Sequence, residues 1–105
     1  MFETIKKLFG ITSTDYADLI KKGAVIVDVR TPQEYKSGHI KSAMNIPLQS
    51  LQNNLSKLKN KKTPVITCCA SGSRSAMAKN ILKNNGYTEV YNGGGWASLD
   101  RKINN

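Results

Sequence analysis

Cysteine and histidine are scarce in this sequence of 105 residues. It contains two cysteines, Cys68 and Cys69, and one histidine, His39. Neighbouring cysteines close no useful loop as a disulfide, and these side chains are too few to provide the four ligands of a structural zinc site. We therefore expect no disulfide framework, no metal and no cofactor.

Long apolar stretches are also missing, since no run approaches the roughly 18 residues of a membrane helix. The first stretch, MFETIKKLFG, is interrupted by charged residues and is not followed by a small-residue cleavage site, so it does not resemble a secretory signal. We expect a cytoplasmic protein that does not bind membranes. The length predicts one small domain over residues 11–105, with residues 1–10 as an extension or a short helix.

Acidic residues are few, and 7 of them stand against 16 lysines and arginines, which gives a net charge of +9. A lysine-rich surface that keeps the protein in solution is the simplest interpretation. A positive field that attracts small anions is the functional one. The basic residues are scattered and do not alternate with aromatic residues, as they do in many nucleic-acid-binding proteins. We therefore expect no nucleic-acid partner.

The most informative stretch is residues 64–85, PVITCCASGSRSAMAKNILKNN. The β-branched residues 65–67 predict a strand, and apolar residues over 77–82 recur at helical spacing. The small residues 70–73 between them predict a tight loop whose backbone N–H groups point inward. A cysteine in this loop faces the positive end of the helix, which favours its thiolate and attracts anions. The stretch therefore predicts a cysteine nucleophile that acts on anions.

Residues 69–75, CASGSRS, resemble the C-x-x-G-x-R-S active-site loop of the rhodanese-like sulfurtransferases. Residues 25–47 are similar to a second signature of that family, which they match through VIVDVRTPQEY, GHI, Ala43 and NIP. Residues 86–96, GYTEVYNGGGW, are similar to a third signature. In the third, Asn92 stands where an apolar residue is usual, and Trp96 comes early after the glycines. The resemblance covers residues 14–98 and implies a single-domain thiosulfate sulfurtransferase.

Strand patterns and helix patterns alternate along the chain. Strands are predicted over 24–29, 42–46, 64–68 and 89–91, and helices over 14–22, 31–35, 48–58, 96–103 and from the cysteine loop to residue 85. Alternation implies crossover connections and a mostly parallel sheet with helices on both faces. The rhodanese resemblance implies an α/β three-layer sandwich whose central sheet has about five strands. Ligands of such sheets bind beyond the carboxyl ends of the strands, where Asp28 and Cys69 fall.

Either cysteine fits a known loop. Counted from Cys69, the spacing to Arg74 matches the sulfurtransferases, whose ring of N–H groups fits one bound sulfur. Counted from Cys68, the same residues form the C-x5-R-S pattern of cysteine phosphatases and arsenate reductases, whose loop binds a tetrahedral anion. Gly72 fits only the first spacing, and Thr67 stands where phosphatases usually have histidine. We assign Cys69 as the nucleophile and Cys68 to the core; a non-catalytic regulatory module is a third interpretation, although such modules usually lack the cysteine.

The resemblance implies a two-step transfer in which the Cys69 thiolate takes the outer sulfur of thiosulfate and passes it to cyanide or a thiol. The N–H groups of the loop would hold the persulfide, which makes the candidate substrate-binding residues Ala70, Ser71, Gly72, Ser73 and Arg74. Arg74 either binds the substrate anion or forms an ion pair that shapes the loop. The supporting residues are Asp28, Arg30 and Glu34. A sulfur-relay protein is a further candidate partner, and we expect a monomer.

Overall fold

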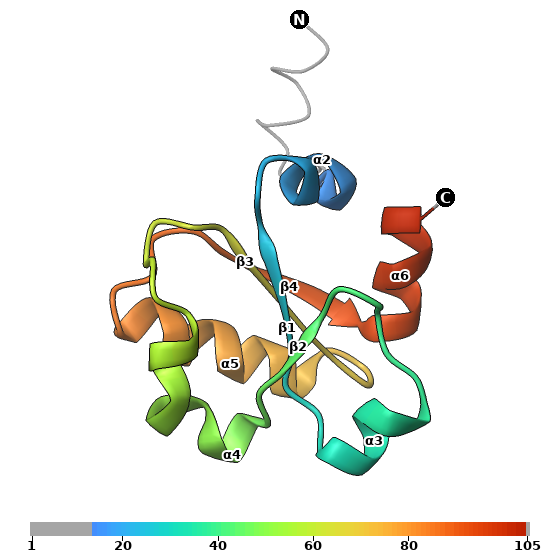
Figure 1. The fold of residues 1–105 in the computed structure, drawn as a ribbon, viewed down its shortest axis with the longest axis horizontal. Coiled ribbons are helices and arrows are strands. Elements are labelled where there is room, and N and C mark those ends of the chain that lie inside the picture. Colours follow the sequence, from blue (N-terminus) through green and yellow to red (C-terminus); the bar gives the residue numbers. More distant parts are fainter. Residues whose placement is uncertain (1–13, 105) are drawn as a thin grey trace, which may run out of the picture.

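The computed structural model describes residues 14–104, and its helices and strands alternate as the sequence predicts (Figure 1). In chain order they are α2 (Tyr16–Lys21), β1 (Val25–Asp28), α3 (Pro32–Ser37), β2 (Met44–Asn45), α4 (Leu48–Leu51), the 3-10 helix η1 (Gln52–Lys57), β3 (Val65–Cys69), α5 (Ser73–Asn84), β4 (Val90–Gly95) and α6 (Trp96–Asn104). The extension predicted over residues 1–10 lies outside the described residues.

The sheet is parallel throughout, with strand order β2-β1-β3-β4. This confirms the α/β class and the parallel sheet. About five strands were expected, and the described part of the chain contributes four. Four segments of the sequence have a strand pattern, and the connections between them fold into helices and turns.

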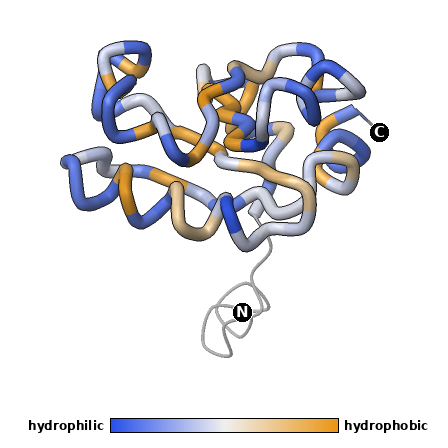
Figure 2. The backbone as a smooth tube through the Cα atoms, turned by 90° about the horizontal axis from the view of Figure 1, so that it is seen from below, coloured by the Kyte–Doolittle hydropathy of each residue, from blue (hydrophilic) through white to orange (hydrophobic). Residues whose placement is uncertain are grey.

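Apolar side chains alternate between the two faces of the sheet and form two core clusters. Val65 and Cys69 belong to the cluster on the side of α4, η1 and α5. Ile66 and Cys68 belong to the other, where α2, α3 and α6 contribute side chains. Both faces are thus covered, and the hydrophobic stretches run through the middle of the fold in Figure 2. Within residues 14–104, no helix has the length and apolar composition needed to cross a membrane.

The segment predicted as one helix over residues 48–58 is divided in two. The α-helix α4 gives way to η1, in which Asn54 has non-helical backbone angles (φ −126°, ψ 23°). The Asn54 side-chain amide donates to the Ser50 carbonyl oxygen at 2.7 Å, an alternative partner that competes with the helical ladder. Local hydrogen bonding by one asparagine therefore overrides the leucine spacing.

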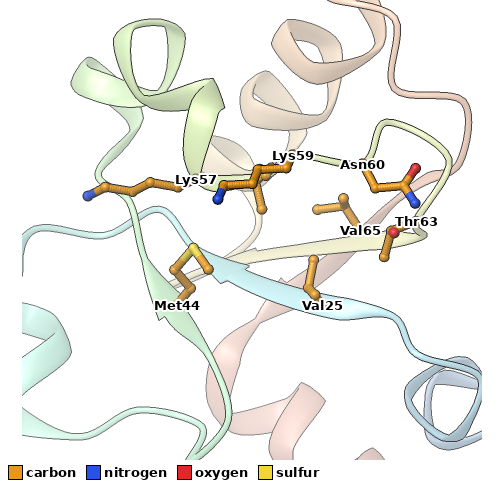
Figure 3. Close-up of a pocket in the computed structure, with 8 residues that line it drawn as sticks. Val25, Met44, Lys57, Lys59, Asn60, Thr63 and Val65 are labelled. Atoms are coloured by element: carbon orange, nitrogen blue, oxygen red, sulfur yellow. The ribbon is translucent and has the colours of Figure 1, made fainter.

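A small hollow of about 100 Å³ lies where β1 and β3 begin, at the edge next to β2 (Figure 3). Val25, Val65 and Met44 line it from the strands, and Lys57 and Lys59 from the segment around the end of η1. Cys69 lies at the opposite, carboxyl end of β3. This hollow is therefore not part of the cysteine site.

Leu99 on α6 provides a test of the second core cluster. Its side chain is fully buried, so Leu99→Ala should lower the free energy of unfolding by about 2–5 kcal/mol through lost contacts and a residual cavity. Met77 on α5 is 52% exposed and provides the matched control, because Met77→Ala should change stability by less than about 0.5 kcal/mol. Urea unfolding followed by circular dichroism measures both. Equal small losses would contradict the packing of α6.

Candidate active site

Cys69 is the last residue of β3, and its sulfur accepts hydrogen bonds from the loop that follows and from the first turn of α5. The backbone N–H groups of Gly72 and Ser75 lie 2.9 Å and 3.4 Å from Sγ. Gly72 is the N-cap of α5, so the sulfur lies at the positive end of that twelve-residue helix. The predicted strand, loop and helix are present, and the N–H groups converge on Cys69.

The two cysteines have opposite electrostatic environments. Burial alone would raise the pKa of the Cys69 thiol, but hydrogen bonds from the backbone N–H groups of Ser75, Gly72 and Ser71 outweigh it and hold that pKa below its ordinary value. Cys68 points to the other face of the sheet, where burial, helped by the Asp28 charge, raises its pKa to about 12. The geometry therefore favours the thiolate at Cys69 and the neutral thiol at Cys68.

The cysteine loop rests on the glycines at the end of β4. The register of β3 and β4 shifts between Thr67, which pairs with Asn92, and Cys69, which pairs with Gly95. A Cβ atom added to Gly95 would lie 2.8 Å from the Ala70 carbonyl oxygen, so the two backbones approach as closely as glycine permits. The sequence predicted only a bend at glycines 93–95, whereas β4 continues through a bulge and packs against the cysteine loop.

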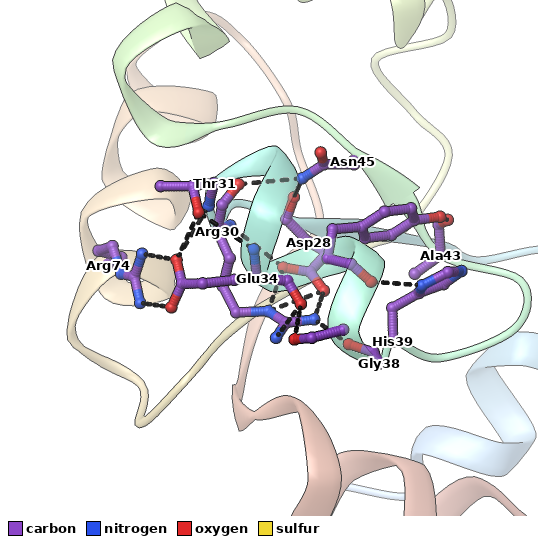
Figure 4. A network of polar contacts seen from close by, with 11 residues as sticks. Asp28, Arg30, Thr31, Glu34, Gly38, His39, Ala43, Asn45 and Arg74 are labelled. Atoms are coloured by element: carbon purple, nitrogen blue, oxygen red, sulfur yellow. Dashed lines mark hydrogen bonds and ion pairs between the residues drawn. The ribbon is translucent and has the colours of Figure 1, made fainter.

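Arg74 reaches across to α3 and forms a two-pronged ion pair with Glu34 (Figure 4). The distances are 2.7 Å from Nη1 to Oε1 and 3.0 Å from Nη2 to Oε2. Glu34 also accepts from the backbone N–H of Thr31 at 3.0 Å, which completes a capping box at the start of α3. Of the two roles that the sequence left open for Arg74, this structure contains the ion pair that shapes the loop.

A second ion pair is buried at the end of β1. Arg30 donates to both carboxylate oxygens of Asp28, at 2.7 Å through Nη2 and 2.9 Å through Nε. Its guanidinium also donates to the carbonyl oxygens of Glu34 and Gly38 and lies 4.8 Å from the centre of the Trp96 ring. Asp28 and Arg30 therefore fix the turn from β1 into α3 and hold Glu34 in place (Figure 4).

Two residues beside the loop were missing from the predicted site. Ser75 donates its backbone N–H to the Cys69 sulfur, and its hydroxyl contacts Asn92. Asn92 is half-buried on β4 and touches the loop through its side chain. Its one sequence signal was a polar residue in an expected apolar position, and that signal did not indicate which element it would contact.

The comparison with known families agrees with this arrangement. The profile of the rhodanese-like domain family matches residues 12–101. The chain belongs to this family. The match includes the cysteine loop, both strands that carry Asp28 and Cys69, and the glycines of β4.

Two curated relatives and one solved structure illustrate the degree of similarity in sequence and in fold. The uncharacterized protein YqhL of Bacillus subtilis is 41% identical over 81 residues, which are 76% of this chain and 64% of that protein. Thiosulfate sulfurtransferase PspE of Escherichia coli is 39% identical over 70 residues, 66% of this chain and 67% of the relative. A structure of rhodanese with anions from E. coli is 36% identical with a TM-score of 0.68, over 71% of this chain and 89% of that one. The chain thus spans about two thirds of the length of each curated relative.

The buried pair gives a stability prediction. Asp28→Asn should lower the free energy of unfolding by about 3–5 kcal/mol, because the buried Arg30 guanidinium loses its counter-charge. Adding Arg30→Met should recover part of that loss, since the double variant has no unpaired buried charge. Urea unfolding at pH 7 completes the double-mutant cycle. Strictly additive losses would show that the two side chains do not interact in solution.

The Arg74 guanidinium, with help from Thr31, lowers the pKa of Glu34 from 4.5 to about 2. Because the folded-state pKa is the lower one, the stabilisation is complete above the unfolded pKa and is lost as the pH falls through about 2. The stability difference between wild type and Glu34→Gln should therefore be constant at neutral pH and shrink below about pH 4.5. An NMR titration of the Glu34 carboxyl reports the midpoint directly, and a midpoint near 4.5 would show that the ion pair is absent in solution.

Proposed function

We propose that this protein is a sulfurtransferase that moves sulfane sulfur from thiosulfate, or from another persulfide donor, to a thiophile through a persulfide on Cys69. The observation that carries the proposal is the pair of backbone N–H groups, of Gly72 and Ser75, that lie 2.9 and 3.4 Å from the Cys69 sulfur. Such groups lower the pKa of the thiol before reaction and can stabilise an anionic sulfur after it. The sulfurtransferase name of the relative PspE adds support.

In the first step the Cys69 thiolate attacks the outer sulfur of thiosulfate. A new sulfur–sulfur bond forms to Cys69, the bond from that sulfur to the sulfonate breaks, and sulfite leaves with its electron pair. The charge of the thiolate passes to the terminal sulfur of the persulfide. Since this sulfur is also an anion, the loop N–H groups of residues 70–74 and the start of α5 stabilise it in turn.

In the second step cyanide or a thiolate attacks the terminal sulfur, and the thiolate of Cys69 is the leaving group. A hollow of about 170 Å³ next to the loop has room for a small acceptor, and its lining residues are Val29, Thr31, Pro47, Leu48, Gln49 and Arg74. The mixture of apolar and polar lining residues suits the body of an organic thiol. A sulfur-relay protein as acceptor and a monomeric state stay predictions, as does the cytoplasmic location.

The phosphatase or arsenate reductase alternative would use Cys68 as the nucleophile. Cys68 belongs to the core cluster on the α6 face, and its pKa is raised to about 12. A thiol in that environment is mostly protonated at neutral pH and faces away from the loop that would bind the anion. The third interpretation, a regulatory module without catalysis, does not explain why N–H groups point at the Cys69 sulfur and lower the pKa of this thiol.

The test compares wild type, Cys69→Ser and the matched control Cys68→Ser. After incubation with thiosulfate alone, intact mass spectrometry should show a gain of one sulfur atom in wild type and in Cys68→Ser, but none in Cys69→Ser. Thiocyanate formation from thiosulfate and cyanide should follow the same order, with at least about a 1000-fold loss in Cys69→Ser, because the nucleophile of a covalent mechanism is removed.

Aryl phosphate and arsenate are assayed on the same variants. Turnover of either anion that disappears in Cys68→Ser and survives in Cys69→Ser would overturn the proposal in favour of the C-x5-R-S loop that begins at Cys68. Absence of both the added sulfur and any anion turnover in the folded wild type would favour the regulatory module.

A further inference from the structure

A single side chain, Asn92 on β4, joins the glycine bulge to the cysteine loop. Its carboxamide oxygen accepts the backbone N–H of Gly94 at 2.9 Å, which fixes the amide orientation. Its Nδ2 group then donates to the Gly72 carbonyl oxygen at 3.3 Å. The Ser75 hydroxyl donates to the same Asn92 oxygen. The side chain therefore contacts both residues whose N–H groups donate to the Cys69 sulfur.

Gly72 needs such an anchor more than its neighbours do. It has a φ of +111°, in the region that glycine enters freely, and a glycine also leaves that region freely. Its Cα position faces Gly94, where an added Cβ would lie 3.5 Å from the Gly94 Cα atom, so backbone meets backbone without side chains to hold them. Fixing the Gly72 carbonyl restricts the rotation of this residue, and with it the direction of the N–H group on the sulfur.

Ser75 is held in the same way. Its hydroxyl lies 3.0 Å from the Gly72 carbonyl oxygen and contacts Asn92, and its own carbonyl oxygen accepts from the Thr67 hydroxyl at 2.9 Å. These contacts fix the first turn of α5 against β3 and β4. The Ser75 N–H group, at 3.4 Å from Sγ, is the more distant of the two donors and depends on this placement.

We propose that Asn92 is a positioning residue for the reactive cysteine: its carboxamide ties Gly72 and Ser75 to the β4 bulge and so aims their N–H groups at the Cys69 sulfur. Asn92 acts through the loop, and the reacting atoms contact the backbone groups that it holds. The inference rests on the proposed role of Cys69 as the reactive thiol. It adds β4 to the elements that determine how readily that thiol ionises.

The test measures the rate of Cys69 alkylation by iodoacetamide against pH, because alkylation reports the thiolate and needs no sulfur donor. Peptide mass spectrometry reads Cys69 separately from Cys68. The variants are Asn92→Leu, which removes every polar contact, and Asn92→Ser, whose shorter side chain keeps an oxygen near Gly94 but does not reach Gly72. The matched control is Asn85→Ser, which removes an amide at the far end of α5.

In both Asn92 variants the alkylation rate at pH 7 should fall about tenfold, with the profile moved to higher pH and the high-pH plateau unchanged, because a weaker hold on the N–H groups destabilises the thiolate. Asn85→Ser should overlay wild type. Thermal unfolding identifies which variants are folded, and Asn92→Ser decides the outcome if Asn92→Leu does not fold. A profile that overlays wild type, or one that changes only in plateau height, overturns the proposal.

The thiosulfate reaction separates this inference from the proposed function. If wild type gains no sulfur while the alkylation profile shifts in the Asn92 variants, the transfer reaction is wrong and the role of Asn92 stands. If wild type gains sulfur and the profile stays in place, the transfer stands and the role of Asn92 is wrong.

Discussion

The hydrogen bonds from backbone N–H groups to the Cys69 sulfur are the interaction on which the rest of the site depends. Burial opposes the thiolate, and these bonds reverse that effect. Because the donors belong to the backbone, their direction is set by the path of the chain and not by a rotamer. The rest of the fold must therefore hold this short loop of small residues in one conformation.

The loop is held from two sides by different kinds of contact. On the α3 side, the half-buried Glu34–Arg74 pair connects the loop to a helix that the buried Asp28–Arg30 pair fixes in place. On the β4 side, glycine backbones meet the loop directly and Asn92 adds hydrogen bonds. The first support relies on charge, so acid weakens it, whereas the second consists of neutral groups that do not titrate near neutral pH.

The alternating helices and strands, the parallel sheet and the cysteine at the end of a strand could be predicted from the sequence, because they follow from local patterns that tertiary contacts reinforce. Two predictions were wrong: one continuous helix over residues 48–58, and a bend in place of the last residues of β4. At Asn54 a local side-chain hydrogen bond to Ser50 outweighs the leucine spacing, whereas the glycines 93–95 pack against residues that are distant in sequence. Asn92 was missed for the same reason as these glycines, since its partners are 17 and 20 residues away in sequence.

The two adjacent cysteines lie on opposite faces of the sheet, Cys69 with α5 and Cys68 with α6. A disulfide needs Cβ atoms within about 4.5 Å and side chains that point toward each other, which successive residues of a strand do not provide. If Cys69 carries a persulfide as proposed, Cys68 is therefore not placed to resolve it. In that case the persulfide would persist until an external acceptor arrives, and the supply of that acceptor would determine its lifetime.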